Sequence, residues 1–402
     1  MEDKRTKKIR AYRIIMLVVL TAIISCMTTS IFMYKKIEDK LQTAETTEQN
    51  IMLQKMQMFK SMLNAKYIYD IDEESLKEGA LKGYVEGLGD KYTEYLTKEE
   101  MDDLKEEVNS EYVGIGVYIS NIDDQIYIVG VMPGSPALEA GLKEGDIITK
   151  INGKEYNGEK LNDATTELKQ KEGTTVQVTY IRDDKENEVT VERRKITVEH
   201  VAGQMLENNV AYIQITSFEK GTADSFKEKL EELKNQGATK IIIDVRSNGG
   251  GIVDEATRIA NMFIDKGETL LITKGKDETE KITKAEEEPI AKDMKIAILT
   301  NKSTASASEI LAGALKDKKG ATLVGTQTYG KGVIQTVYSL GDGSGIKITT
   351  EEYFTPNHNK INGEGLTPDY EVKLTKDSSG NYETALDSDT QLLKAEEILK
   401  NN

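Results

Sequence analysis

Cysteine and histidine are nearly absent from this 402-residue chain, and tryptophan is absent altogether. The single cysteine, Cys26, excludes an intramolecular disulfide. Because Cys26 lies in the most apolar stretch, it is a poor candidate for a redox or metal-binding residue. With only two histidines besides, a zinc site is disfavoured, and we expect neither metal nor cofactor. Neither histidine lies near a serine-rich turn, which argues against a serine–histidine triad.

Beyond the N-terminus acidic side chains outnumber basic ones. The net charge is −16 at pH 7, although residues 1–13 carry six Lys or Arg against two acidic residues. The rest of the chain is therefore strongly acidic. Because nucleic acid is itself an anion, we expect no nucleic-acid binding by this body.

A long uncharged stretch follows the basic cluster. Residues 14–34 are 21 residues without a charged side chain, and a helix needs about 20 apolar residues to cross a bilayer core. The positive-inside rule places residues 1–13 in the cytoplasm as a basic tail. We therefore predict a single-pass anchor in the cell membrane, with the rest of the chain extracytoplasmic. The alternative is a cleaved signal peptide, disfavoured by the length of the stretch and the lack of an A-x-A site.

Helical patterns follow a polar linker at residues 35–50. Residues 51–96 form an N-terminal helical part, in which residues 51–64 and 75–88 show helical spacing. A third helix is predicted at 97–108, with Thr97 as N-cap and Glu100 at the capping-box position. In the first helix we expect a core-facing stripe rather than a methionine-rich ligand site. The stripe consists of Met52, Met56, Phe59 and Leu63.

From Tyr112 short β-like runs and glycine turns replace the helical pattern. The resulting unit, mostly β with two helices, resembles a PDZ domain. Together with its leading helix it spans residues 97–192. The run E-Y-V-G-I-G-V resembles the carboxylate-binding loop, and G-D-I-I-T-K-I-N-G resembles a later PDZ signature. Backbone N–H groups in such a loop form a nest for a terminal carboxylate. The alternative is a tight glycine turn of any small β domain. The residues implied are Val113, Gly114, Ile115, Gly116 and Val117.

After Val210 strands and helices alternate. Val210–Ile215 and the buried run Lys240–Val245 are predicted strands, and Thr222–Gln236 is an amphipathic helix. This alternation indicates an α/β domain with layered helices. We place it at 193–375, with the PDZ-like unit interrupting or preceding it. Further elements are expected at Asp254–Phe263, Met294–Thr300 and Ser306–Leu315, and residues 376–402 form a C-terminal tail and helix.

Two segments offer catalytic side chains. Ser306 lies between a predicted strand and a predicted helix, where backbone N–H groups can bind an oxyanion. The alternative is a helix cap, a role that Ser303 and Ser308 share. Lys331 ends the run G-x-x-x-x-G-K, which is similar to the motif of a phosphate-binding loop. That motif needs Ser or Thr at the next position, where this chain has Gly332. The S-x-x-K match at 344–347 lies among glycines, not on a helix, and neither G-x-S-x-G nor H-E-x-x-H occurs.

Taken together, the motifs resemble the C-terminal processing peptidases of the S41 serine peptidase family over about residues 51–400. They include I-I-D-V-R-S-N-G-G-G, S-T-A-S-A-S-E-I-L-A-G-A-L and Y-G-K-G-V-I-Q. The resemblance implies that Ser306 is the nucleophile, Lys331 the general base and Gln335 the residue that orients the lysine. It further implies an oxyanion hole from the backbone N–H of Ala307 and one from Gly249 or Gly250.

A lysine base must lose its proton near neutral pH. Its ordinary pKa is about 10.4, and lowering it by about 3 units costs about 4 kcal/mol. Burial can supply this, and Val333, Tyr329 and the Ile310–Leu311 region are the candidate neighbours.

The resemblance implies a membrane-anchored serine endopeptidase that cleaves protein or peptide substrates near their C-termini, with the PDZ-like unit binding the tail. The alternatives are a PDZ adaptor on an inactive peptidase scaffold and a P-loop NTPase, the latter disfavoured by Gly332. The amphipathic segments 51–64 and 389–400 either close the core or form the contact of a homo-oligomer. We favour the core for the first.

Overall fold

The computed structural model describes residues 51–109, 111–376, 382 and 384–401, which divide into two compact units after Gly79. The predicted basic tail, anchor and linker at 1–50 lie outside the described residues. Among the residues that are described, no helix has the length and apolar character needed to cross a membrane.

The first unit contains a helix over residues 51–66 and the start of α2 (Glu73–Glu86). The predicted core-facing stripe on the first helix is wrong, because every one of its side chains is exposed. Periodicity identified an apolar face correctly but could not show whether anything in the same unit would cover it. The exposed fractions are 49% for Met52, 40% for Met56, 53% for Phe59 and 37% for Leu63.

In the second unit, helix α3 (Lys98–Val108) directly precedes the β-rich PDZ-like part. The predicted capping box is confirmed at its start. Thr97 Oγ1 accepts from the Glu100 N–H at 3.2 Å, and a Glu100 carboxylate oxygen accepts from the Thr97 N–H at 2.8 Å. These bonds satisfy donors that a helix start otherwise leaves unpaired, so the helix begins where the sequence predicts.

The PDZ-like unit is a six-stranded antiparallel sheet with two α-helices. The chain enters along β2 (Glu111–Gly114) and leaves along β9 (Arg194–Thr197), which pair with each other. Strand β2 ends before Gly116, whose φ of +83° turns the backbone out of the β region. The remaining elements are β3 (Val117–Ile122), β4 (Gln125–Val131), α4 (Pro136–Glu139), β5 (Ile147–Ile151), β6 (Lys154–Glu155), α5 (Leu161–Lys169), β7 (Thr175–Arg182) and β8 (Lys185–Glu192).

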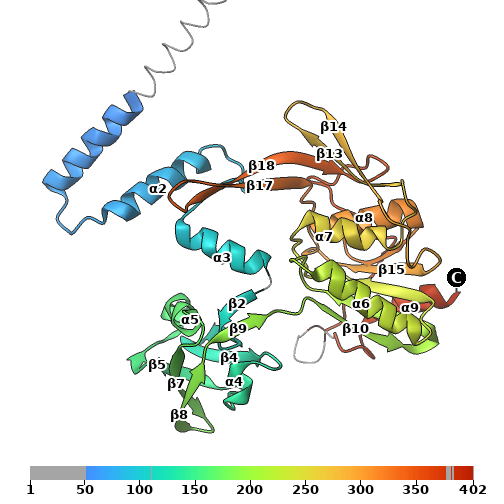
Figure 1. The fold of residues 1–402 in the computed structure, drawn as a ribbon, viewed down its shortest axis with the longest axis horizontal. Helices are drawn as coiled ribbons and strands as arrows, with labels where there is room; N and C mark the ends of the chain where they lie inside the picture. The colour runs from blue at the N-terminus through green and yellow to red at the C-terminus, as the bar shows by residue number, and fades with distance from the viewer. Residues whose placement is uncertain (1–50, 110, 377–381, 383, 402) are drawn as a thin grey trace, which may run out of the picture. The chain divides into compact units, whose positions relative to one another are not determined.

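The α/β core is built on a six-stranded sheet of order β10-β11-β12-β15-β16-β19. Figure 1 labels β10 and β15 of this sheet. All neighbours are parallel except β10, which pairs antiparallel with β11. Because parallel strands covered on both faces are apolar throughout, their sequences read as continuous hydrophobic runs. The strands are β10 (Val201–Leu206), β11 (Val210–Ile215), β12 (Lys240–Asp244), β15 (Lys295–Thr300), β16 (Thr322–Gly325) and β19 (Tyr370–Glu371).

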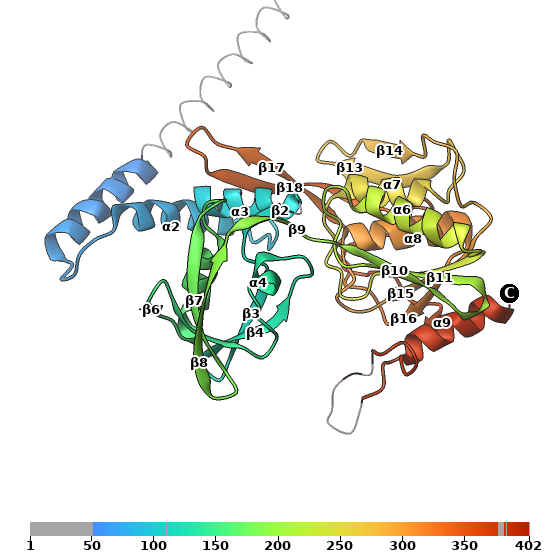
Figure 2. The same ribbon diagram turned by 60° about the horizontal axis from the view of Figure 1, so that its bottom comes forward.

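Helices cover this sheet on both faces, as Figure 2 shows. Ile241 and Ile243 pack in one cluster with α6 (Thr222–Asn235), α7 (Val253–Asn261) and α8 (Ala307–Lys319), whereas Ile242 packs in another with α9 (Thr390–Asn401). Alternate residues of one strand therefore point to opposite helical layers. The predicted α/β core with layered helices is confirmed.

A second, antiparallel sheet joins distant parts of the chain. Its central strand β18 (Gly345–Phe354) pairs with β1 (Glu94–Leu96), which precedes the PDZ-like unit. That unit therefore interrupts the core rather than preceding it. The other strands are β13 (Thr269–Gly275), β14 (Glu280–Lys284) and β17 (Val333–Ser339).

Candidate active site

Ser306 lies at the turn between β15 and α8, where its φ of 56° and ψ of −120° are unusual for a residue with a side chain. Such a conformation costs about 1–3 kcal/mol and persists only where surrounding contacts impose it. Gly250 packs against this turn so closely that a Cβ there would lie 2.7 Å from Ser306 Cβ. The turn thus presents Ser306 beside the glycine run after β12, as the family resemblance implies.

Lys331 lies in the loop between β16 and β17. Its Nζ stands 4.8 Å from the centroid of the Tyr92 ring. Burial, followed by the nearby cations Lys347 and Lys91, lowers the pKa of Lys331, while Tyr329 and Asp90 raise it. The predicted direction of the pKa shift is confirmed. Tyr92 is a neighbour of Lys331 that was not predicted from the sequence.

The turn that carries Tyr92 is fastened to β18. Asp90 accepts from the Thr93 hydroxyl at 2.6 Å and from the Tyr92 N–H at 3.1 Å. Thr93 Oγ1 in turn accepts from the Thr349 N–H at 3.0 Å. A turn held by three hydrogen bonds keeps the Tyr92 ring beside the Lys331 amine, where it favours the ammonium form.

The three predicted catalytic side chains are not joined in the structure. Among the hydrogen bonds of the described residues, none links Ser306 Oγ, Lys331 Nζ and the Gln335 amide. Gln335 Nε2 instead donates to Thr349 Oγ1 over a long 3.4 Å. Catalytic hydrogen bonds are often loose without substrate and tighten when it binds, so this geometry fits a substrate-free state.

Glu309 ties the backbones of Ser306 and Lys331 together. One carboxylate oxygen accepts from the Ser306 N–H at 2.9 Å and from the Lys331 N–H at 3.0 Å. The other accepts from the Thr328 hydroxyl at 2.6 Å and the Gly330 N–H at 2.8 Å. Burial raises the pKa of this fully enclosed carboxyl, against these four donors. This role of Glu309 was not predicted, although a Glu three residues after a helix-capping Ser is a signal for it.

The glycine turn after β12 supplies a candidate oxyanion site. Asn248 Oδ1 accepts from the Gly250 N–H at 2.8 Å, so that N–H is already engaged. Within the described part of the chain, the N–H groups of Gly249 and Ala307 donate no hydrogen bond. Of the two glycines that the family resemblance implies, Gly249 is therefore the better candidate, paired with Ala307.

Ser308 also acts differently from the prediction. Instead of capping the helix, its hydroxyl is fully buried and donates to the Asn248 carbonyl at 3.0 Å. The Ala305 N–H binds the same carbonyl, also at 3.0 Å. Both bonds clamp the glycine turn onto the start of α8, and they fix the two candidate oxyanion donors relative to each other.

A buried charge cluster supports the glycine turn from the other side. Arg246 forms ion pairs with Asp244 at 2.6 Å and with Asp389 at 2.7 Å. Asp244 also accepts from the Tyr212 hydroxyl at 2.7 Å. Burial opposes the charge of Arg246, but Asp244 and Asp389 outweigh it and raise its pKa. No motif in the sequence predicted this cluster.

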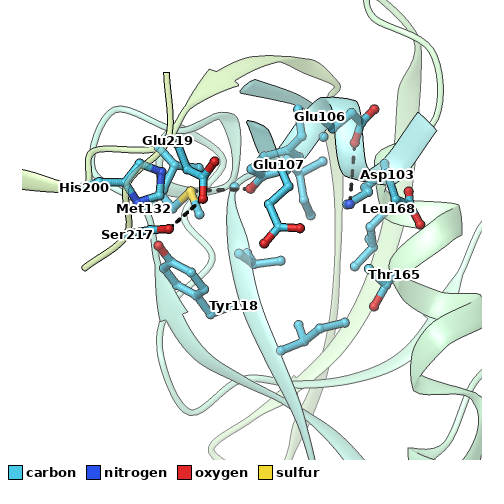
Figure 3. A pocket seen from close by; sticks show the side chains of 18 residues that line it. Asp103, Glu106, Glu107, Tyr118, Met132, Thr165, Leu168, His200, Ser217 and Glu219 are labelled. Carbon is cyan, nitrogen blue, oxygen red and sulfur yellow. Dashed lines mark hydrogen bonds and ion pairs between the residues drawn. The ribbon is translucent and has the colours of Figure 1, made fainter. Parts of the chain in front are cut away.

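A groove of about 560 Å³ lies along the predicted carboxylate loop of the PDZ-like unit. Gly114, Ile115, Gly116 and Val117 line it, whereas Val113 does not. Across the described residues, the N–H groups of Ile115 and Gly116 donate no hydrogen bond, which leaves them available to a carboxylate. Figure 3 shows acidic residues of α3 at the same groove, with Glu107 extending into it.

Local structure excludes the phosphate-binding-loop match at Lys331 and the S-x-x-K match at 344–347. The chain continues from Lys331 into β17 rather than into the helix that a phosphate-binding loop requires. Ser344 bonds to Asp342 at 2.6 Å, and Lys347 on β18 forms an ion pair with Glu94 on β1. Lys347 is therefore not presented to Ser344 on a helix.

Comparison with known proteins gives consistent matches along the chain. Family models match for peptidase family S41 at residues 209–372, for the PDZ domain at 113–192 and for the activating protease CtpB N-terminal domain at 19–100. A "Probable CtpA-like serine protease" of Staphylococcus aureus (strain COL) is 37% identical, covering 94% of this chain and 77% of its own. One of the same name from Staphylococcus haemolyticus (strain JCSC1435) is 37% identical over 84% of this chain and 67% of its own.

A solved structure shares the fold. It is a protein of Bacteroides fragilis NCTC 9343 assigned to the S41 proteases. The match has a TM-score of 0.56 at 18% identity, and covers 84% of this chain and 93% of that one. At this identity the similarity concerns the fold alone.

Proposed function

We propose that Ser306 and Lys331 form the catalytic dyad of this chain, which belongs to peptidase family S41 and is a serine protease of the C-terminal processing type with a PDZ domain. The observation that carries this proposal is the shared Glu309 carboxylate oxygen, which accepts from the backbone N–H of both residues. These two hydrogen bonds hold the backbones of the nucleophile Ser306 and the base Lys331, which come from two separate loops, next to each other.

In the proposed reaction, neutral Lys331 takes the proton of the Ser306 hydroxyl as Oγ bonds to the scissile carbonyl carbon. The carbonyl electrons move to oxygen, and the N–H groups of Gly249 and Ala307 stabilise that oxyanion. The C–N bond then breaks, and the Lys331 ammonium returns the proton to the leaving amine. Water repeats the sequence on the acyl-enzyme, which releases the product acid and restores Ser306.

We assign Gln335 to the orientation of the lysine in the substrate-bound state. In the substrate-free structure Lys331 rests against Tyr92, and the weak Gln335–Thr349 bond leaves the amide easily released. A neutral amide accepts a hydrogen bond from the amine without stabilising its charge as a carboxylate does. The base would therefore be oriented while keeping its lowered pKa.

We place the substrate's C-terminal tail in the PDZ groove. The free N–H pair at Ile115 and Gly116 matches a terminal carboxylate, and the apolar side chains of Ile115, Val117 and Leu168 match an apolar last residue. Binding there would bring the nearby chain to Ser306 and regulate cleavage. Cleavage near the substrate's C-terminus follows from that tethering.

We further propose that residues 14–34 anchor the protein, with the catalytic body outside the cytoplasm. The uncharged 21-residue stretch after a basic cluster supports this orientation. The test is alkaline carbonate extraction of membranes, with added protease on intact cells as the second readout. Retention in the membrane and digestion from outside are expected. A protein released by carbonate, or protected in intact cells, would contradict the anchor.

The dyad is tested by cleavage of a peptide with a free C-terminus by the full-length protein. Ser306→Ala and Lys331→Ala are expected to abolish cleavage without changing the melting temperature. The matched control is Ser303→Ala, because Ser303 is an exposed serine of the same loop, and its activity should persist. Turnover like that of the parent in either dyad variant would exclude the dyad. A parent protein that binds the tail without cutting it would favour the PDZ adaptor alternative.

A further inference from the structure

Tyr353 on β18 is a buried side chain, 1% exposed, whose hydroxyl reaches both halves of the proposed dyad. It lies 3.1 Å from the Ser306 carbonyl oxygen and 2.5 Å from the Lys331 carbonyl oxygen. Glu309 joins the same two residues through their N–H groups. Tyr353 is thus a second link between them, made through their carbonyls and from strand β18, whereas Glu309 is on helix α8.

The two carbonyls depend on Tyr353 to different degrees. The Ser306 carbonyl also accepts from the N–H groups of Glu309 at 2.8 Å and Ile310 at 3.0 Å, so α8 already satisfies it. For the Lys331 carbonyl, Tyr353 is the partner found among the described residues. A hydroxyl has one hydrogen to donate, and the shorter contact is to Lys331. Loss of this hydroxyl would therefore act mainly on the base.

The loop around Lys331 needs such a support because residues 326–332 form neither helix nor strand. Tyr353 contacts it twice, since its own N–H also donates to the Gly332 carbonyl at 2.9 Å. Two consecutive peptide groups are thereby fixed against β18. A displacement of about 1 Å in a reacting group can cost on the order of 100-fold in rate, so the backbone position of Lys331 bears directly on proton transfer.

We propose that Tyr353 is a positioning residue for the dyad: its hydroxyl holds the Lys331 backbone at the distance from Ser306 that lets the amine reach Oγ. This inference rests on the proposed roles of Ser306 and Lys331. Burial raises the pKa of Tyr353, so the hydroxyl remains a protonated donor wherever the enzyme is active. In the described part of the chain the Tyr353 hydroxyl bonds to the backbone carbonyls of Ser306 and Lys331 and to no side chain.

The test is Tyr353→Phe in the full-length protein, which removes one hydroxyl and keeps the ring. We expect kcat to fall about 10-fold, in line with one lost buried hydrogen bond, with KM unchanged. We also expect the rise of kcat/KM with pH to move to higher pH, because a displaced lysine amine meets more water. Tyr95→Phe is the matched control. Tyr95 is a buried tyrosine on the adjacent β1 strand whose hydroxyl makes none of the described hydrogen bonds.

A rescue variant separates positioning from folding. Replacement of Tyr353 by 4-aminophenylalanine keeps an N–H donor at the same place and is expected to recover most of the lost kcat and the parent pH profile. The proposal is overturned if Tyr353→Phe keeps the parent kcat and pH profile. It is also overturned if activity falls equally at every pH in proportion to folded protein, or if the amino variant rescues stability alone. Cleavage by Ser306→Ala would instead refute the dyad itself.

Discussion

Asp389, just before the C-terminal helix α9, forms a 2.7 Å ion pair with Arg246, which precedes the glycine turn of the active site. Both side chains are buried, at 1% and 11% exposure. Asp389 also caps α9, because its Oδ1 accepts from the N–H groups of Gln391 and Leu392 at 3.0 Å. The C-terminal helix is therefore linked through one carboxylate to the turn that carries the candidate oxyanion donor Gly249.

The first prediction separates the charge of Asp389 from its capping role. Asp389→Asn keeps Oδ1 as a helix-cap acceptor but removes the charge opposite Arg246. Breaking a buried ion pair costs about 3–5 kcal/mol. Because Asp244 remains as a partner of Arg246, we expect a loss of about 3 kcal/mol in the free energy of unfolding in urea, together with a lower kcat.

The control for this prediction is Asp387→Asn, two residues away on an exposed side chain, which should leave both quantities unchanged. An Asp389→Asn variant as stable as the parent would show that the ion pair does not hold α9 to the active-site turn.

The second prediction concerns Glu309, whose two oxygens accept four hydrogen bonds. Glu309→Gln replaces one oxygen with an NH₂ group, which cannot accept from the donors it faces. Two buried donors are left unpaired, at about 1–3 kcal/mol each, so we expect kcat for peptide cleavage to fall at least about 100-fold.

Glu255→Gln is the matched control. Glu255 on α7 is another buried carboxylate, and it accepts a hydrogen bond from the Ala223 N–H at 2.6 Å. It should lower stability while leaving kcat per folded molecule near the parent value. Equal kcat losses in the two variants would mean that Glu309 supports folding only.

The layered core could be predicted because its cause is local in the sequence. A run such as Lys240–Val245 is apolar throughout since both faces of the strand are covered. The strand-to-helix position of Ser306 was visible for the same reason. The stripe containing Phe59 was predicted to be buried but is exposed, because periodicity identifies an apolar face without identifying the surface that packs against it.

The support of the site could not be predicted because it depends on contacts between distant segments. Tyr92 meets Lys331, Tyr353 meets Ser306, and Asp389 meets Arg246 across long stretches of chain. Most of these contacts involve one side chain and a backbone group or ring, which leave no periodic signal in the sequence. The family resemblance pointed to Ser306 and Lys331 but not to the groups that hold them.

The third prediction tests the electrostatic environment of Lys331. Lys347 lowers the pKa of Lys331 by like-charge repulsion. Lys347→Gln removes that charge and leaves Glu94 without its ion-pair partner. Both changes favour the Lys331 ammonium, so its pKa should rise. The amine is active only when neutral, and we therefore expect activity to fall at neutral pH and the kcat/KM profile to move to higher pH.

The measurement is kcat/KM for one peptide across the pH range in which the protein stays folded. Lys281→Gln, on an exposed position of β14, changes the net charge equally and should leave the profile in place. A profile for Lys347→Gln that shifts downward, or coincides with that of Lys281→Gln, would rule out this electrostatic contribution.

The last prediction tests capture of the substrate tail by the PDZ domain. Hydrogen bonds to a charged group contribute about 1.5–3 kcal/mol, so amidating the C-terminus of a peptide should raise KM about 10- to 100-fold. Gly116→Ala should remove this discrimination. A Cβ at Gly116 would lie 2.3 Å from Ser135 Cβ and displace the loop that offers the N–H pair.

Gly145→Ala is the control: Gly145 also has a positive φ, of +90°, but has open space around it and lies outside the groove. Equal cleavage of free and amidated tails by the parent protein would remove the carboxylate from the recognition of substrate.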